Sequence, residues 1–172
     1  NLKFVLEVAK ILKLKKNSLL KTLQKFKGLK YRQEIIFQSK KLTIINDSKA
    51  TTFSSSVSLL KSLTNVYWIV GGQAKKGDTL LLYKKNCINF KAYIFGTNKN
   101  FFINEIKKLM KYDSFIDLKS LVKKLFLEIK ADKSTIHKTI LFSPSAASFD
   151  NFKNFEKRGE YFNQLIKRYI NA

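Results

Sequence analysis

The sequence contains a single cysteine, Cys87, and a single histidine, His137. One cysteine excludes an internal disulfide, and this pair is too small for a structural zinc site with four cysteine or histidine ligands. No motif flanks either residue, so we interpret Cys87 as a packing residue or a spare surface thiol, and His137 as a bystander, rather than a nucleophile and its base. The scarcity of cysteine fits a reducing, cytoplasmic compartment.

Long apolar runs are also missing. No segment approaches the roughly 20 apolar residues of a membrane-spanning helix, and the charged start NLKFVLEVAKILKLKK does not resemble the apolar core of a signal peptide. The sequence has no initiator methionine, so we expect it to begin inside a longer protein. Hydrophobic residues still make up 45% of the 172 residues, which is enough for a packed core and argues against disorder.

Acidic residues and arginine are scarce in a strongly basic chain. Twelve Asp and Glu stand against 34 Lys and Arg, which gives a formal net charge of +22, yet only three of the basic residues are arginines. Strong basicity is the usual electrostatic footprint of nucleic-acid binding, but bidentate recognition of phosphates and bases favours arginine. We therefore interpret the scattered lysines mainly as solvated faces and expect no nucleic-acid partner. A basic nucleic-acid-binding module stays open as an alternative function.

Hydrophobic spacing divides the chain into two parts. Apolar residues at helical spacing predict helices over residues 2–14 and 18–26, with Gly28 as the stop. Two short helices bury little surface by themselves, so this hairpin is expected to belong to something larger. A boundary is therefore predicted near residues 28–31.

Beyond this boundary, strand-like and helix-like segments alternate. Apolar runs predict strands at residues 34–38, 42–46, 66–70, 92–95, 112–116 and 139–142. Helical patterns follow at residues 52–63, 100–110 and 118–129, and from about Phe149 to the end. This alternation predicts an α/β fold with a mostly parallel sheet flanked by helices. Ligands of such sheets gather beyond the carboxyl ends of the strands, which selects the loops after Asn46, Val70, Phe95 and Phe142.

The loop after Asn46 carries an unusual set of polar groups. The stretch Asp47-Ser48-Lys49-Ala50-Thr51 places a carboxylate, an ammonium and two hydroxyls directly before a predicted helix. Asp or Thr could cap that helix, but capping leaves the cation beside the carboxylate unexplained. We therefore favour a functional interpretation of this loop.

Two further loops suit an anionic ligand. The loop of residues 71–78 combines glycines, which permit close backbone approach, with Lys75 and Lys76. A solvated loop explains this stretch equally well, and the P-loop pattern is absent throughout the chain. The small residues 143–148 leave room for a ligand before a helix predicted at Phe149, whose free N–H groups favour a carboxylate. The residues by themselves predict an anion-binding α/β domain without a catalytic dyad.

At these loops the sequence resembles the Mur ligases, and within that family the branch that adds D-glutamate. The matching pieces are GLKYRQEI, INDSKAT, IVGGQAKKGD and LFSPSAASFDNFKNFEKRGEYF, in family order and at family spacing. The resemblance implies that residues 1–30 are the helical tail of a central ATP-binding domain and residues 31–172 a C-terminal Rossmann-like ligase domain. Tyr31 stands where the family usually has His. The P-loop, the Mg²⁺ ligands and the UDP-binding domain would lie upstream, so this fragment alone is expected to be inactive and to hold no metal.

The activity implied by the resemblance is ATP-dependent amide formation in peptidoglycan precursor synthesis in the bacterial cytoplasm. The carboxylate of UDP-N-acetylmuramoyl-L-alanine is phosphorylated by ATP with Mg²⁺, and the amine of D-glutamate attacks the acyl phosphate. A sibling Mur or folylpolyglutamate-type ligase with another amino acid is the alternative. The diaminopimelate-adding branch would carry an Asp-Asn-Pro-Arg-like motif, which is absent here because the only proline is Pro144.

The resemblance also assigns roles to individual residues. Arg32 would contact the phosphates of ATP and Asp47 its ribose hydroxyls, and Asn1 would match the last residue of a further nucleotide-binding motif. Lys49 would be the catalytic residue, stabilising the negative charge that develops on the reacting groups. The expected D-glutamate ligands are Thr51, Lys75, Ser148, and backbone groups around Phe149 and Phe155. The upstream domains of the same enzyme would be its remaining partners.

Overall fold

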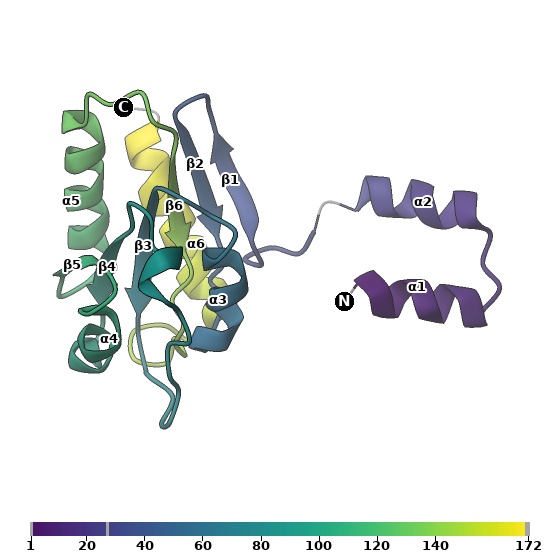
Figure 1. The fold of residues 1–172 in the computed structure, drawn as a ribbon, viewed down its shortest axis with the longest axis horizontal. Helices are drawn as coiled ribbons and strands as arrows, with labels where there is room; N and C mark the ends of the chain where they lie inside the picture. The colour runs from purple at the N-terminus through teal and green to yellow at the C-terminus, as the bar shows by residue number, and fades with distance from the viewer. Residues whose placement is uncertain (1, 27, 171–172) are drawn as a thin grey trace.

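A computed structural model describes residues 2–26 and 28–170 of the chain. Beyond an N-terminal helical hairpin, the strands form one sheet in the order β1-β2-β6-β3-β4-β5 (Figure 1). Strand β1 is antiparallel to β2, and the other neighbouring strands are parallel. The predicted α/β class with a mostly parallel sheet is confirmed.

The strands lie close to their predicted positions. They are β1 (Glu34–Gln38), β2 (Leu42–Asn46), β3 (Val66–Gly71), β4 (Lys91–Phe95), β5 (Lys111–Ser114) and β6 (Lys138–Phe142). The helices are α1 (Leu2–Ile11), α2 (Lys16–Lys25), α3 (Phe53–Leu60), α4 (Lys99–Ile106), α5 (Leu118–Ala131) and α6 (Phe155–Ile170), with a 3₁₀ turn η1 (Lys84–Asn86). Strands β2, β3, β4 and β6 are buried almost throughout because helices cover both faces of the sheet.

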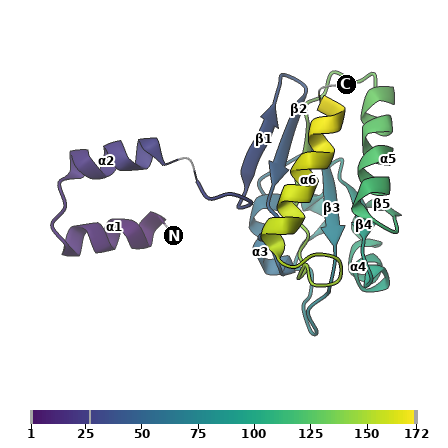
Figure 2. The same cartoon turned by 180° about the vertical axis from the view of Figure 1, so that it is seen from behind.

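Each face of the sheet has its own hydrophobic core. On one face, α3 and α4 pack against β3 and β4 around the buried rings of Phe53, Trp68 and Phe102. On the other face, α5 and α6 lie side by side over the sheet (Figure 2). There the rings of Phe142 and Phe162 stack with their centroids 4.2 Å apart. Cys87 is buried in the first core, so of the two predicted alternatives it is a packing residue and not a surface thiol, and burial raises the pKa of its thiol.

The last helix begins later than the sequence predicts. A helix was expected from about Phe149, whereas α6 starts at Phe155. The carbonyl of Ser148 accepts hydrogen bonds from the backbone N–H groups three and four residues further on, which closes a local turn. The side chain of Asn154 then accepts a 2.8 Å hydrogen bond from the N–H of Lys157 and so fixes the helix start. The phenylalanine spacing runs on through this turn, which is why periodicity misplaced the boundary.

The α1–α2 hairpin lies apart from the sheet and its covering helices (Figure 1). Many of its apolar side chains face solvent, among them Phe4 at 74% and Ile11 at 78% exposure. A concentration of exposed apolar side chains is typical of a surface that another domain or chain covers. The assignment of residues 1–30 to a separate domain stays a prediction. No helix within residues 2–26 and 28–170 combines the length and the hydropathy needed to cross a membrane.

Candidate ligand site at the carboxyl ends of the strands

The loops that follow β3 and β6 are joined to each other at one edge of the sheet. The N–H of Gly71 donates a 2.9 Å hydrogen bond to the carbonyl of Pro144. Two residues after Gly71 and three residues after Pro144, Gln73 and Ala147 exchange two backbone hydrogen bonds of 3.0 Å in an antiparallel bridge. Because β2, β6 and β3 are parallel neighbours, the loop after β2 opens at the same edge. The three loops selected from the sequence therefore form one surface.

The residues that follow β6 are packed rather than open. The small residues 143–148 were expected to leave room for a ligand, yet all of them except the half-buried Ala147 are buried. The Ser56 hydroxyl, from α3, lies 2.6 Å from both the Ser143 and the Ser145 hydroxyls, and the Trp68 indole donates to the Ser143 carbonyl at 2.8 Å. The predicted free space is absent beside Ser143 and Ser145, because the Ser56 hydroxyl of α3 occupies it. Sequence reasoning missed Ser56, whose only signal was its place in a serine triplet.

Asp47 lies at the centre of this edge and is only 5% exposed. Its carboxylate accepts hydrogen bonds from the N–H of Gln33 at 3.2 Å and from the hydroxyl of Ser143 at 2.8 Å. Burial raises the pKa of Asp47, although the bonds from Ser143 and Gln33 and the charge of Arg32 act in the opposite direction. The residue therefore ties the β2 loop to the start of β1 and to the end of β6.

The raised pKa of Asp47 predicts a pH-dependent stability. Because the folded state binds this proton more tightly than the unfolded state, the Asp47 contribution to stability falls as pH rises from the unfolded pKa through the folded pKa. The substitution Asp47→Asn removes that titration. We therefore expect the melting temperature of Asp47→Asn minus that of wild type to be largest near neutral pH. This difference should become smaller towards pH 4. Thermal unfolding of both proteins at several pH values checks this, and a pH-independent difference would contradict it.

A cleft of about 350 Å³ opens beside Asp47. Its lining residues are Arg32, Gln33, Asp47, Lys49, Ala50 and Ser55. Arg32 is exposed and stands between two residues in the left-handed conformation, Tyr31 with φ 61° and Gln33 with φ 50°. Each such residue costs about 1–2 kcal/mol, and the bond from the N–H of Lys49 to the carbonyl of Tyr31 at 3.0 Å helps to hold this backbone. Two cations from the two ends of the β1–β2 hairpin thus share one cleft.

Lys49 is half-buried and reaches the first residue of α6. Its ammonium nitrogen lies 3.8 Å from the ring centroid of Phe155, a favourable cation–π distance. The neighbouring Ser48 hydroxyl donates a 2.8 Å hydrogen bond to the carbonyl of Phe155. The structure therefore brings together Lys49 and Phe155, two of the residues that the sequence analysis selected.

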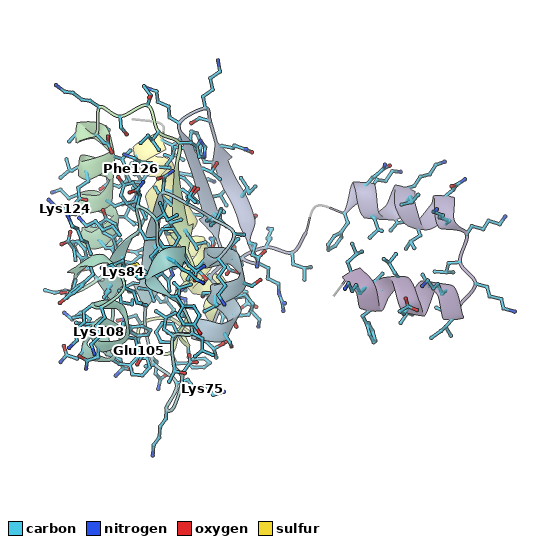
Figure 3. All side chains as sticks on the ribbon, in the orientation of Figure 1. Lys75, Lys84, Glu105, Lys108, Lys124 and Phe126 are labelled. Atoms are coloured by element: carbon cyan, nitrogen blue, oxygen red, sulfur yellow. The ribbon has the colours of Figure 1, made fainter. Side chains whose placement is uncertain are left out.

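The loops that carry Thr51 and Lys75 are joined by a helix cap that neither residue makes. The carboxylate of Asp78 accepts a 2.8 Å hydrogen bond from the N–H of Phe53, the first residue of α3. The cap of this helix therefore comes from the β3 loop, and not from Asp or Thr of the β2 loop. It places the turn of residues 75–78 beside the start of α3, where Thr51 is half-buried. Lys75 itself is exposed, at the tip of the domain in Figure 3.

The remaining selected residues have different surroundings. Ser148 is 3% exposed, and its carbonyl serves the local turn before α6. Phe149 is 72% exposed and does not begin a helix. Asn1 lies outside the described residues. Within the two described ranges, no three His, Cys, Asp or Glu side chains are grouped in a way that could hold a metal ion.

A buried arginine that sequence reasoning missed lies beneath the loops. Arg158 on α6 is 0% exposed and donates to the Ser48 carbonyl at 2.7 Å, the Ser48 hydroxyl at 3.1 Å and the Ala146 carbonyl at 2.9 Å. Burial lowers its pKa to about 10, against the opposing charge of Asp150, so it stays protonated at neutral pH. It fastens the β2 and β6 loops to α6. The available signal was its rarity, because an arginine in a lysine-rich chain marks a position that needs the planar guanidinium.

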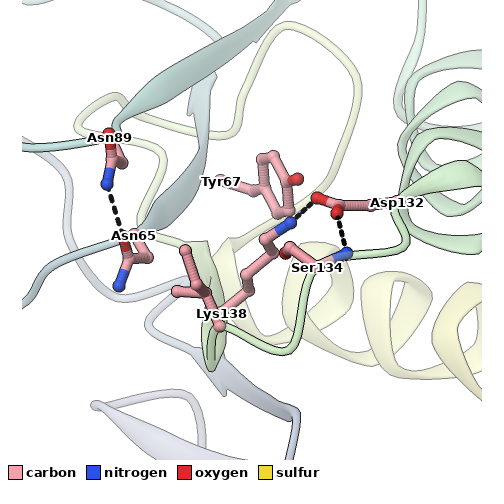
Figure 4. Close-up of a pocket in the computed structure, with 7 residues that line it drawn as sticks. Asn65, Tyr67, Asn89, Asp132, Ser134 and Lys138 are labelled. Atoms are coloured by element: carbon pink, nitrogen blue, oxygen red, sulfur yellow. Dashed lines mark hydrogen bonds and ion pairs between the residues drawn. The ribbon is translucent and has the colours of Figure 1, made fainter.

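A second hollow, of about 310 Å³, lies near the amino ends of β3 and β6 (Figure 4). Its polar groups are paired with each other: Asn89 donates to Asn65 at 2.9 Å, and Lys138 forms an ion pair with Asp132. His137, next to Lys138, lies within hydrogen-bond distance of the Thr43 hydroxyl and the Lys40 carbonyl at this same end of the sheet. These groups hold the amino ends of the strands together. They are remote from the loops after β2, β3 and β6, which follow the carboxyl ends of the strands.

Comparison with known proteins places the chain in a family. No family model matches it. It is 35% identical over 161 residues to UDP-N-acetylmuramoylalanine–D-glutamate ligase of Wolbachia sp. subsp. Brugia malayi (strain TRS), an alignment of 94% of the chain with 32% of that protein. For the ligases of the same name from Rickettsia prowazekii (strain Madrid E) and Francisella tularensis subsp. tularensis (strain FSC 198), the identities are 34% over 162 residues and 35% over 170 residues.

These two alignments include 94% and 96% of the chain but only 36% and 40% of the relatives. The chain thus spans about a third of the length of the curated relatives that it matches. The resemblance drawn from the four sequence pieces is confirmed, and the chain belongs to the Mur ligase family, corresponding to the C-terminal portion of its D-glutamate ligases.

Proposed function

We propose that the chain is the C-terminal part of an ATP-dependent ligase that adds D-glutamate to UDP-N-acetylmuramoyl-L-alanine in peptidoglycan precursor synthesis. The names of its relatives support the substrates. The observation that carries the proposal is the cleft in which Arg32, Asp47 and Lys49 meet. Two cations and a carboxylate suit a nucleotide whose phosphates are transferred. ATP and these substrates occur in the bacterial cytoplasm, which we propose as the location.

In this proposal the cleft holds the nucleotide. The exposed guanidinium of Arg32 binds the phosphates, for which its planar fork of donors is suited. An ionised carboxylate accepts hydrogen bonds only, so Asp47 binds donors such as the ribose hydroxyls. The two bonds that Asp47 already accepts, from Gln33 and Ser143, fix its orientation before a nucleotide arrives. The cleft is therefore preorganised on its acidic side.

Lys49 is the proposed catalytic residue. When the substrate carboxylate attacks the terminal phosphate of ATP, and when the amine then attacks the acyl phosphate, negative charge accumulates on oxygen atoms. A fixed ammonium near those atoms lowers the barrier, because it stabilises the charge without prior reorganisation. The contact with the Phe155 ring supports this role, since it restrains the long side chain of Lys49 at the N-terminus of α6.

D-glutamate binds, in this proposal, between the three loops. It carries two carboxylates, and we assign Thr51 and Lys75 to one of them. We assign Ser148, with backbone groups near Phe149 and Phe155, to the other. The Asp78–Phe53 cap supports the first pair, because it fixes the Lys75 turn next to the residues that follow Thr51. Charge-assisted hydrogen bonds of this kind contribute about 1.5–3 kcal/mol each.

The reaction also uses Mg²⁺, which neutralises phosphate charge during transfer. At such sites Mg²⁺ is usually held by one or two carboxylates together with the phosphates themselves, and we propose that its protein ligands lie in other domains of the same enzyme. Those domains would also cover the apolar α1–α2 hairpin. The linker of residues 28–31 is the proposed pivot of domain closure, which solution scattering of the intact enzyme with and without substrates would test.

The decisive experiment measures phosphate release by the intact gene product. The reaction contains ATP, Mg²⁺ and UDP-N-acetylmuramoyl-L-alanine, with D-glutamate, L-glutamate or L-lysine as the amine. We expect release that requires D-glutamate. The substitution Lys75→Ala is expected to lower kcat/KM for D-glutamate by about 10- to 100-fold, because one charge-assisted hydrogen bond is lost.

Lys76→Ala is the matched control, since it removes the same charge one residue along the same exposed loop. Its kcat/KM should stay within about twofold of wild type, as for a solvated surface lysine. If Lys76→Ala were the damaging variant, the ligand assignment would move to Lys76. Release driven by another amino acid would keep the ligase but overturn D-glutamate, and no release with any amine would overturn the proposal.

A further inference from the structure

A groove lined by lysines lies at the amino ends of β4 and β5, whereas the ligand loops follow the carboxyl ends of their strands. Its volume is about 670 Å³. We call it the lysine groove, and its lining residues are Lys84, Lys91, Lys107, Lys108, Leu109, Met110, Lys111, Tyr112 and Asp113. The side chains of Lys84 and Lys108 lie on the same flank of the domain in Figure 3. The groove is therefore separate from the proposed ligase site.

The charge of this groove is not balanced from within. Lys91 is neutralised, because its ammonium lies 2.8 Å from a carboxylate oxygen of Asp113 and 2.8 Å from one of Glu128. Four exposed lysines remain, and in the described part of the chain no carboxylate pairs with any of them; they are Lys84, Lys107, Lys108 and Lys111. The carboxyl end of α4 attracts cations, but a helix end carries only about half an elementary charge. A net positive charge therefore remains in a concave site, where the field is focused.

Shape and chemistry together favour a flexible polyanion with flat apolar parts. A concave groove fits a chain better than it fits a flat bilayer surface. Its floor offers Leu109, Met110 and the ring of Tyr112, which is 38% exposed. Lysines hold phosphates as point charges, and an exposed aromatic ring stacks on any base. The lining has no Arg, Asn or Gln to read base edges.

We propose that the lysine groove binds single-stranded nucleic acid without sequence preference, with its phosphates on the four lysines and a base on Tyr112. This function is additional to the proposed ligase activity. The sequence analysis expected no nucleic-acid partner because the lysines are scattered along the chain. Three of the four groove lysines lie within residues 107–111, at the end of α4 and the start of β5, and the fold adds Lys84 from η1 to them.

The test compares two variants of the intact gene product that have the same net charge. One carries Lys→Gln at the four groove positions 84, 107, 108 and 111. The other carries Lys→Gln at the exposed positions 119, 123, 130 and 133, on and just after α5. Fluorescence anisotropy measures binding of a labelled single-stranded RNA of about 12 nucleotides, and of the DNA of the same sequence, at several salt concentrations.

We expect the groove variant to lose on the order of tenfold or more in affinity, and its salt slope to fall by about 3, because four phosphate contacts at about 0.7 each disappear. The α5 variant should keep most of its affinity. Tyr112→Ala should weaken RNA binding by roughly tenfold and leave binding of inorganic polyphosphate, which has no bases, unchanged. Both quadruple variants replace exposed side chains, so circular dichroism melting should show them as stable as wild type.

Three results would overturn the proposal. Equal losses in the two quadruple variants would assign the binding to net charge alone. Unchanged affinity in the groove variant would place any binding elsewhere on the enzyme. Poly-glutamate that displaces the RNA as well as polyphosphate does would show that the groove takes acidic protein segments instead.

Discussion

Replacing Gly71 by alanine is expected to destabilise the sheet domain by more than about 4 kcal/mol, a loss that few single substitutions reach. Gly71 has a φ of +137°, a backbone conformation that residues with a side chain rarely adopt. A β-carbon at this position would lie 2.0 Å from the carbonyl oxygen of Phe95. These two residues are partners in the β3–β4 register. Because the obstacle is the backbone of a neighbouring strand between two cores, neither side can move away.

This result would also correct the interpretation of the glycine pair. The sequence analysis took Gly71 and Gly72 as room for a ligand beside the backbone. In the structure the close approach is to the protein itself, since a β-carbon on Gly72 would lie 2.7 Å from the Ala147 carbonyl oxygen. The glycines hold the β3 loop against β4 and the β6 loop, and they thereby position the loop that carries Lys75.

Gly77→Ala is the matched control for this prediction. Gly77 also has a positive φ, +77°, but no atom lies within 4 Å of the position of a new β-carbon. Only the backbone strain remains, at about 1 kcal/mol. Denaturant unfolding of the intact protein gives the free energy of unfolding of both variants. The difference between them separates the cost of steric overlap at residue 71 from the cost of backbone strain alone. Equal stabilities of Gly71→Ala and Gly77→Ala would show that the predicted overlap is absent.

Lys49→Met is expected to lower the kcat of the proposed ligase by about 100- to 1,000-fold, as the loss of a group that stabilises developing charge does. Methionine keeps most of the length of the side chain, and its thioether can still pack against an aromatic ring, so the main change is the loss of the ammonium. The KM for D-glutamate should change little, because its carboxylates are assigned to other residues. Phosphate release at saturating substrates measures kcat, and its dependence on D-glutamate measures KM.

Lys61→Met, an exposed lysine at the end of α3, is the control for losing one charge from the same region. Its kcat should remain within about twofold of wild type. Thermal melting of Lys49→Met should match wild type, since a structural role would lower both stability and activity. A kcat within threefold of wild type would contradict the catalytic role of Lys49 and leave Arg32 as the cation at the reacting phosphate.

The sequence by itself determined the architecture of this protein. Apolar runs such as residues 66–70 and 139–142 are buried on both faces, and their alternation with amphipathic helices permits few arrangements other than a parallel sheet. Parallel strands end at the same edge, so four loops could be selected before their contacts were known, and the polar residues of three of them indicated a ligand. The four sequence pieces also gave the family, because they carry the loops themselves.

Only the tertiary structure decided how those loops are held. Asp78 caps α3 from another loop, Arg158 fastens Ser48 and Ala146 from the last helix, and Ser56 fills space that looked open in the sequence. The start of α6 moved to Phe155, because a local turn competes with helical periodicity. Each of the first three contacts joins residues far apart in the chain, and a hydrogen bond depends on the final positions of both partners. Local spacing carries no information about those positions.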